Sequence, residues 1–170
     1  MMRVCLTGVE STGKSTLAPL LASRFDAVVV PEYGRAWAET NGTDFTIEAL
    51  RAIAAGHVAA RNALLANHPA IVIEDTDIVM TSAWSRMLHG ARDPALSAIP
   101  ADADLYLLFE PDTPWIDDGT RQFPGDQRAR FHVIIADELA TPGVVPVPIS
   151  GDWAERLSAA TAAIQRMGST

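Results

Sequence analysis

The sequence contains little of what builds disulfide frameworks, secretion signals or membrane spans. Cys5 is the only cysteine among 170 residues, which excludes an internal disulfide and a multi-cysteine zinc site and suits a reducing compartment. No stretch approaches the roughly 20 apolar residues of a transmembrane helix, and the start of the chain is too short and too mixed for a signal peptide. We therefore expect a cytoplasmic protein with no membrane partner.

Basic residues are scarce as well. Lys and Arg number 13 against 21 Asp and Glu, which gives a formal net charge of -8. Because nucleic-acid phosphates attract clustered Lys and Arg, we expect no nucleic-acid partner, and any phosphate site has to be local. The 48% hydrophobic and 20% charged composition is that of a folded protein, and the length suits one core. We predict a single domain over residues 1–170, whose oligomeric state the pattern does not specify.

Short apolar runs rich in β-branched residues alternate with segments of helical periodicity. Both alternations of each run are apolar, as in strands buried on both faces. Strand alternating with helix predicts an α/β fold with a parallel five-stranded sheet and helices on both faces. The predicted strands are 3–7, 27–31, 70–74, 105–109 and 144–148, and the predicted helices are 14–24, 35–40, 46–67, 78–89, 126–139 and 152–167.

The segment from Gly8 to Thr16 reads G-V-E-S-T-G-K-S-T and fits the pattern G-x-x-x-x-G-K-[ST] between a predicted strand and a helix. Glycines let backbone N–H groups turn toward phosphates, and the helix N-terminus favours negative charge. We expect ATP and Mg²⁺ here, with Lys14 at the β- and γ-phosphates and Ser15 at the metal. No guanine-selective N-K-x-D motif occurs. Further contacts to the nucleotide are expected from Gly8, Glu10, Ser11, Thr12, Gly13 and Thr16.

A second acidic group is expected near the cation, at the end of a neighbouring buried strand. The run I-V-I-E-D-T-D at 71–77 supplies candidates. In an extended strand Asp75 and Asp77 share one side and Glu74 points the other way. We assign Asp75 to the magnesium water shell. The alternative is that these acids cap the helix beginning near Ile78, which fits Asp77 well.

A phosphate-binding motif does not name a reaction. A metabolite kinase also needs a carboxylate that activates or orients the acceptor hydroxyl, and arginines that stabilise the transferring group. Glu32 follows the second strand, at the edge where ligands bind in this architecture, and Asp77 is the second candidate base. A mobile lid is expected at about 111–127, with Arg121 on it and Arg128 on the next helix. The alternatives are a helix-start acid for Glu32 and solvated surface charge for the arginines.

Together these segments resemble the ribosylnicotinamide kinase domain of bacterial NadR proteins, a family of P-loop nucleoside kinases and related small ATPases. The resemblance covers nearly the whole chain. Beyond the 8–16 motif it includes E-Y-G-R at 32–35, G-H at 56–57, D-T-D at 75–77 and T-P-W-x-x-D-G-x-R at 113–121, and it continues through Arg128 and Phe131. The motifs E-Y-G-R and T-P-W-x-x-D-G-x-R are far more specific than the phosphate-binding pattern.

The resemblance implies transfer of the ATP γ-phosphate to the 5′-hydroxyl of nicotinamide riboside, giving nicotinamide mononucleotide in NAD salvage. It also implies that the nucleoside is surrounded by Glu32, Tyr33, Arg35, Asp75, Trp115 and Asp118. An aromatic ring stacks well on a cationic pyridinium, and a carboxylate accepts hydrogen bonds from ribose. NadR proteins also carry a nucleotidyltransferase and often a DNA-binding module. No H-x-G-H motif occurs, so adenylation and transcriptional regulation are not expected.

Two other functions remain open from the residues alone. One is a kinase for another small metabolite, since residue types do not give the shape of a pocket. The other is a regulatory ATPase that hydrolyses ATP without an acceptor. His57 lacks metal-ligand company and is expected to be a packed or helix-surface histidine.

Overall fold

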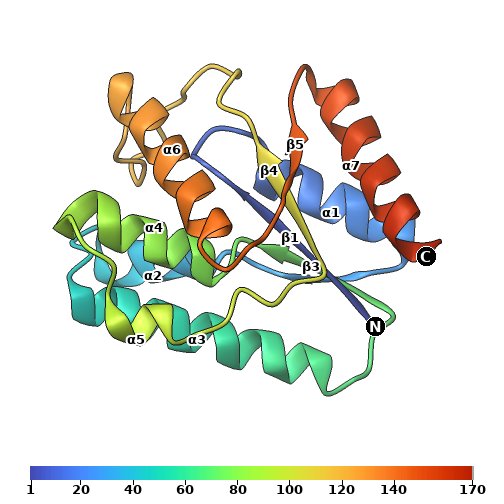
Figure 1. The fold of residues 1–170 in the computed structure, drawn as a ribbon, viewed down its shortest axis with the longest axis horizontal. Coiled ribbons are helices and arrows are strands. Elements are labelled where there is room, and N and C mark those ends of the chain that lie inside the picture. The colour runs from blue at the N-terminus through green and yellow to red at the C-terminus, as the bar shows by residue number, and fades with distance from the viewer. Residues whose placement is uncertain (170) are drawn as a thin grey trace.

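The computed structural model describes residues 1–169, in which helices lie on both sides of one five-stranded sheet (Figure 1). The strand order is β2-β3-β1-β4-β5, and each neighbouring pair is parallel. The predicted α/β P-loop fold is confirmed. In chain order the elements are β1 (Met2–Gly8), α1 (Lys14–Phe25), β2 (Val28–Val30), α2 (Tyr33–Asn41), α3 (Ile47–Leu65), β3 (Ile71–Asp75), α4 (Ile78–His89), α5 (Pro94–Ser97), β4 (Leu105–Phe109), α6 (Asp126–Ala140), β5 (Val147–Ile149) and α7 (Trp153–Gly168).

The sheet separates two apolar cores. On one face α1 and α7 cover side chains such as Val4 and Leu6 of β1. On the other face α4 and α6 pack against Cys5 and Tyr106, while α2 and α3 enclose a third cluster beside α4. Central strands buried on both sides explain why their sequences are apolar at successive positions. Burial raises the pKa of the Cys5 thiol, which suits an inert core residue.

Several element boundaries differ from those that the pattern predicts. Helix α2 begins at Tyr33, two residues before the predicted start, because the preceding turn ends at Glu32. Strand β5 covers only Val147–Ile149 instead of 144–148, since its pairing begins where it reaches Leu107 of β4. Helix α5 is absent from the predicted elements. Its four residues are too few to show a period, although Asp93 caps it and Pro94 opens it.

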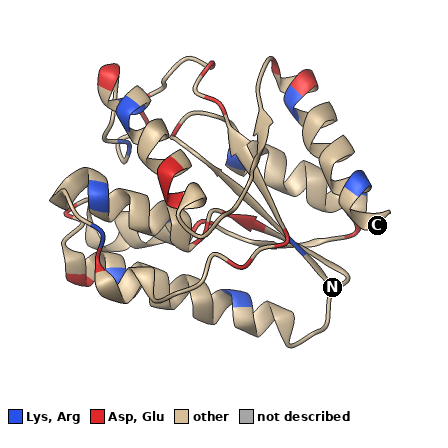
Figure 2. Cartoon of the chain, viewed as in Figure 1, with Lys and Arg blue, Asp and Glu red and all other residues tan. Residues whose placement is uncertain are grey.

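The parallel register brings the carboxyl ends of the central strands to one edge of the sheet. Leu6 of β1 pairs with Asp75 at the end of β3, and Gly8 pairs with Phe109 at the end of β4. Ligands of open α/β sheets bind at this edge. Acidic and basic residues are interspersed over the helices around it (Figure 2). Of the helices among residues 1–169, none combines the length and apolar character needed to cross a membrane.

Candidate active site

The turn after β1, residues 8–16, has backbone angles that suit an anion cradle. Gly8 has a φ of 136°, and a Cβ there would lie 2.6 Å from the carbonyl oxygen of Phe109. Ser11 and Gly13 have φ values of 61° and 86°, and α1 begins directly afterwards at Lys14. A left-handed turn followed at once by a helix N-terminus presents backbone N–H groups to a phosphate. We call residues 8–16 the cradle.

The cradle is held in place from α7, which the sequence analysis did not foresee. Arg156 has no exposed surface, and its guanidinium donates to the carbonyl oxygens of Thr12 at 3.3 Å, Gly151 at 2.8 Å and Glu110 at 3.2 Å. Trp153 lies against Gly13 so closely that a Cβ there would fall 2.2 Å from the indole ring. A glycine is therefore needed at position 13 for packing as well as for its backbone angle.

Lys14 points back across the cradle from the first turn of α1. Its Nζ donates to the carbonyl oxygens of Gly8 at 2.7 Å and Val9 at 2.9 Å, and the residue is buried. Burial lowers the pKa of Lys14, while the negative charges of Glu32 and Asp75 oppose that shift. The ammonium group thus lies in a protected position where its charge acts strongly on a bound anion.

Ser15 and Asp75 fit the needs of a magnesium ion. Asp75 is buried, and its Oδ1 has no hydrogen-bond partner among the described residues. A buried carboxylate oxygen without a partner suits a cation or its water shell. Ser15 supplies a hydroxyl in the first turn of α1. No group of three or more His, Cys, Asp or Glu in residues 1–169 is arranged to hold a metal.

Glu32 occupies the end of β2, at the start of α2, and lines the same cavity as Lys14. It is the N-cap residue of α2, as the helix-start alternative expects, but its side chain makes no capping hydrogen bond. Its Oε2 lies 3.5 Å from Arg35 Nε. Burial raises the pKa of Glu32, although Lys14 and Arg35 pull in the opposite direction. A carboxylate with a raised pKa and a free oxygen is suited to accept a proton near neutral pH.

Asp77 instead takes the capping role that the sequence analysis kept as an alternative. Its Oδ1 accepts from the backbone N–H of Val79 at 2.9 Å, at the N-terminus of α4. Its Oδ2 accepts from the Tyr106 hydroxyl at 2.6 Å. Burial raises the pKa of Asp77 even though these bonds favour the anion. Because both oxygens are engaged, Asp77 is the weaker candidate for the base, and its catalytic role stays a prediction.

The segment 111–125, which we call the lid loop, contacts the cradle mainly through Ser11. The Ser11 hydroxyl accepts from the backbone N–H of Ile116 at 3.0 Å and from Arg121 Nη1 at 2.8 Å. The Thr113 hydroxyl donates to the Ser11 carbonyl oxygen at 2.6 Å. Gln122 N–H donates to the Glu10 carboxylate at 3.2 Å. The lid loop therefore brings Arg121 to the cavity wall, where the sequence predicts it.

Arg128 differs from Arg121 in what its guanidinium contacts. It is buried and donates to the carbonyl oxygens of Glu10 at 3.2 Å and Thr113 at 2.5 Å. It is not among the residues that line the cavity. The predicted catalytic contact of Arg128 therefore stays a prediction. Its donors are engaged by backbone, so it joins the lid loop to the cradle.

Asp118 connects the lid loop with α2. Its Oδ2 lies 3.0 Å from Arg35 Nη1 and 3.1 Å from Arg121 Nε. Burial alone would raise the pKa of Asp118, but the hydrogen bonds from Arg35 and Thr120 outweigh it and lower the pKa to about 2. Asp118 thus stays ionised at all physiological pH values and holds two predicted site arginines in one cluster.

One cavity of about 270 Å³ joins the cradle to a pocket under α2, α3 and α4. We call its far part the distal end. It is apolar and aromatic. Gly56 lets α3 come close to Tyr33 there, since a Cβ at position 56 would lie 2.2 Å from the phenol ring. Sequence reasoning found Tyr33 but missed the other members. The distal end is lined by Tyr33, Ala38, Phe45, Leu50, Ile53, His57, Met80, Thr81 and Trp84.

Trp115 is not among the cavity-lining residues, and its predicted place around the nucleoside stays a prediction. The indole lies on the lid loop, half-buried, and its Nε1 has no partner among the described residues. Phe45 and Trp84 provide the aromatic surface instead, with ring centroids 5.1 Å apart. In the sequence, Phe45 follows the turn N-G-T-D, and Trp84 lies in the predicted helix after D-T-D. Neither signal by itself marks an aromatic residue of a site.

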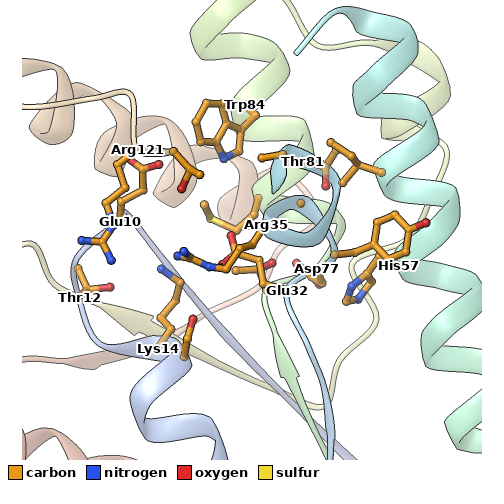
Figure 3. A pocket seen from close by; sticks show the side chains of 18 of the residues that line it. Glu10, Thr12, Lys14, Glu32, Arg35, His57, Asp77, Thr81, Trp84 and Arg121 are labelled. Carbon is orange, nitrogen blue, oxygen red and sulfur yellow. The ribbon is translucent and has the colours of Figure 1, made fainter. Parts of the chain in front are cut away.

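The two ends of the cavity carry opposite charge. Lys14 and Arg121 lie toward the cradle, together with Glu10. Asp77 lies toward the distal end beside His57, with Glu32 and Arg35 between the two ends (Figure 3). The arrangement suits a ligand that is anionic at one end and neutral or cationic and aromatic at the other.

Comparison with known proteins agrees with this geometry. The family model described as an AAA domain matches residues 3–156. The trifunctional NAD biosynthesis/regulator protein NadR of Escherichia coli (strain K12) is 30% identical over 143 residues, and that of Salmonella typhimurium (strain LT2) is 32% identical over 143 residues. Each alignment covers 80% of this chain and 35% of the relative. The chain therefore spans about a third of the length of these relatives.

Solved structures give the same result. A NadR protein in complex with NR superposes with a TM-score of 0.80 at 25% identity, covering 99% of this chain and 52% of the other. Thymidylate kinase from Ehrlichia chaffeensis, at 15% identity and a TM-score of 0.68, covers 97% of both chains and shares the fold. Since the AAA-domain model accounts for most of the chain, from residue 3 to residue 156, the protein belongs to that family, and it is similar in sequence and fold to part of NadR.

Proposed function

We propose that the protein transfers the γ-phosphate of ATP to the 5′-hydroxyl of nicotinamide riboside and forms nicotinamide mononucleotide. The observation that carries this proposal is the single cavity that joins the cradle to an aromatic, acid-bordered distal end. A nicotinamide riboside molecule has the matching polarity, because its pyridinium is flat and cationic and its hydroxyl lies at the other end. Similarity to NadR supports the same choice.

The reaction follows from the groups along the cavity. Glu32 accepts the proton of the acceptor hydroxyl, whose oxygen forms a bond to the γ-phosphorus while the bond from that phosphorus to the β,γ-bridging oxygen breaks. ADP leaves with the electron pair. Lys14 and Arg121, which line the cavity, stabilise negative charge on the phosphoryl group. Ser15 and Asp75 would hold Mg²⁺, which neutralises phosphate charge when bound.

Asp118 and Arg35 link acceptor binding to the lid loop in this proposal. Arg35 lines the cavity and is paired with Asp118 of the lid loop at 3.0 Å. A nucleoside placed between Glu32 and Tyr33 would also contact Arg35. Closure of the lid loop over it would exclude water, so that the γ-phosphate reaches the hydroxyl and not a water molecule. We place this reaction in NAD salvage in the cytoplasm.

A coupled ADP-release assay over a nucleoside panel tests the function. With ATP and Mg²⁺ present, we expect ADP formation to depend on nicotinamide riboside and to be slow without it. ADP formation that depends on a different nucleoside would identify another small-molecule kinase. ADP formation that no nucleoside changes would identify a regulatory ATPase.

A further inference from the structure

Ser11 of the cradle has a backbone conformation that a residue with a side chain rarely adopts. Its φ of 61° lies in the left-handed region, which costs free energy for a residue with a Cβ and almost none for glycine. A glycine at position 11 would form the same turn with less strain. The hydroxyl is what a glycine would lack, so its contacts indicate what the serine contributes.

The Ser11 hydroxyl is fully engaged by the lid loop. Its Oγ accepts from the backbone N–H of Ile116 at 3.0 Å and from Arg121 Nη1 at 2.8 Å. It also lies 3.2 Å from the Ile116 carbonyl oxygen, to which it donates. A hydroxyl has one proton and two lone pairs, so these three contacts use its whole hydrogen-bonding capacity. The side chain of Ser11 therefore serves to join the cradle to the lid loop.

The base of the lid loop is fixed to the cradle in a different way. The Thr113 hydroxyl donates to the Ser11 carbonyl oxygen at 2.6 Å and accepts from Arg128 Nη2 at 3.1 Å, and Arg128 is buried. These contacts need the backbone of Ser11 and not its hydroxyl. Removal of the hydroxyl should therefore free the part of the lid loop that carries Arg121 and leave the base of the loop in place.

Arg121 is held from two sides. Its Nη1 bonds to Ser11 Oγ and to the Ile116 carbonyl oxygen, and its Nε lies 3.1 Å from Asp118. Ile116 and Asp118 belong to the lid loop and move with it, whereas Ser11 belongs to the cradle. The arginine lies at the cradle end of the cavity (Figure 3). The Ser11 hydroxyl thus sets how far the guanidinium lies from a phosphate bound in the cradle.

We infer that Ser11 is a positioning residue that acts through Arg121. Its hydroxyl joins the lid loop to the cradle and holds the guanidinium where it can stabilise the transferring phosphoryl group. The inference rests on the proposed function and adds what keeps the lid loop closed during transfer. A lid loop released from Ser11 would leave Arg121 out of position and admit water to the γ-phosphate. Loss of the hydroxyl should therefore lower kcat and raise the share of ATP lost to hydrolysis, with little change in the KM for ATP.

Two substitutions at position 11 separate the hydroxyl from the backbone strain. Ser11→Gly removes both, and Ser11→Ala removes the hydroxyl alone. We expect each to lower kcat by about tenfold, while Ser11→Gly unfolds at the same temperature as the wild type or a higher one, because its strain is relieved. The control is Asp26→Gly, which relieves a φ of 49° at the end of α1 outside the cavity and should keep kcat. An unchanged kcat in both position-11 variants would overturn the inference.

A double-mutant cycle shows whether Ser11 acts through Arg121. In the Arg121→Gln background, Ser11→Ala should change kcat by less than about twofold, because the group that the hydroxyl positions is already gone. A merely structural role of Ser11 would give the same loss in both backgrounds. A further tenfold loss in the Arg121→Gln protein would therefore overturn the inference.

Tryptic cleavage of the lid loop tests the Ser11 contact without any turnover. Arg121 is the only Lys or Arg in residues 111–125, so trypsin can cut the lid loop only after it. We expect Ser11→Gly and Ser11→Ala to be cut there about tenfold faster than the wild type, and Asp26→Gly at the wild-type rate, with fragments identified by mass spectrometry. Equal rates would overturn the inference and leave the proposed kinase intact. Faster cutting in a protein that phosphorylates no nucleoside would support the Ser11 contact and refute the proposed function.

Discussion

The two ends of the cavity are built in different ways. The cradle is one continuous stretch, Gly8–Thr16, which offers an anion mostly backbone N–H groups and one lysine. The distal end combines single side chains from α2, α3, α4 and the turn that holds Phe45. A backbone-built phosphate site serves many reactions equally well. In the proposed function the side-chain-built end determines which acceptor is used, and changes to each end should therefore affect different kinetic constants.

The largest effect is expected at the cradle. Lys14→Ala should lower kcat by about a thousandfold or more, because it removes the charge aimed at the transferring phosphate. Steady-state ADP release measures it. The control is Arg24→Ala on the same helix, where the guanidinium contacts Thr161 at 3.1 Å and lies outside the cavity. Undiminished transfer by Lys14→Ala would refute the kinase assignment.

Glu32 lies where the two ends meet. Glu32→Gln should keep ATP binding and lower kcat by about a hundredfold, as expected when a general base is lost. Titration calorimetry with an ATP analogue and turnover measurements separate the two properties. Glu39→Gln, on the exposed side of the same helix, is the matched control. If turnover stays near normal in Glu32→Gln, another group activates the hydroxyl.

The pH profile of the wild-type enzyme tests the same residue. Burial raises the pKa of Glu32 above the usual glutamate value of 4.5, and only the ionised form can accept a proton. The plot of kcat/KM against pH should therefore rise through an acid limb whose pKa lies above 4.5 and disappears in Glu32→Gln. An acid limb with an apparent pKa at or below 4.5, or one that persists in Glu32→Gln, would contradict the role of Glu32 as the base.

A change at the distal end should affect the acceptor alone. Gly56→Ala would place a Cβ 2.2 Å from the Tyr33 ring, and the ring has to move into the cavity. We expect the KM for the nucleoside to rise by about tenfold, with the KM for ATP unchanged. Gly168→Ala is the control, because nothing lies within 4 Å of a Cβ there and the residue is outside the cavity. Equal rises in both KM values would mean that the two ends are not separate.

The smallest effect is expected at the lid loop. Asp118→Asn removes the ion pairs with Arg35 and Arg121, which are partly exposed and so weakly stabilising. We expect acceptor-independent ATP hydrolysis to rise by about two- to fivefold relative to transfer, since closure becomes less complete. Parallel ADP and nucleotide-product assays give this ratio. Asp117→Asn changes an acid that only bonds to Gly119 N–H within the lid loop, and it should leave the ratio unchanged.

The contrast between the two ends also explains what could be predicted from the sequence. The cradle and the acids after β3 are contiguous, so a short motif places them, and the buried strands show in their apolar alternation. The distal end is not contiguous. Phe45, His57 and Trp84 come together only when α3 and α4 pack side by side, and nothing local distinguishes them from core residues. Trp115 illustrates the converse, because its neighbours in sequence are site residues while its ring lies away from the cavity.

The residue types of Asp77 and Arg128 alone do not decide between a catalytic and a structural role. A carboxylate after a strand can cap the next helix or act on a substrate, and only the positions of Val79 and Tyr106 decide between these roles. An arginine after a lid loop can reach phosphate or hold the loop, and the carbonyl oxygens of Glu10 and Thr113 decide it here. The prediction of one domain over residues 1–170 stays a prediction.

Identification of the reaction products tests the central claim most directly. The wild-type protein, incubated with ATP, Mg²⁺ and nicotinamide riboside, should convert the riboside into a species with one added phosphoryl group at the 5′-oxygen, seen by mass spectrometry and ³¹P NMR, in a one-to-one ratio with ADP. ADP accompanied by inorganic phosphate and unchanged riboside would contradict the account.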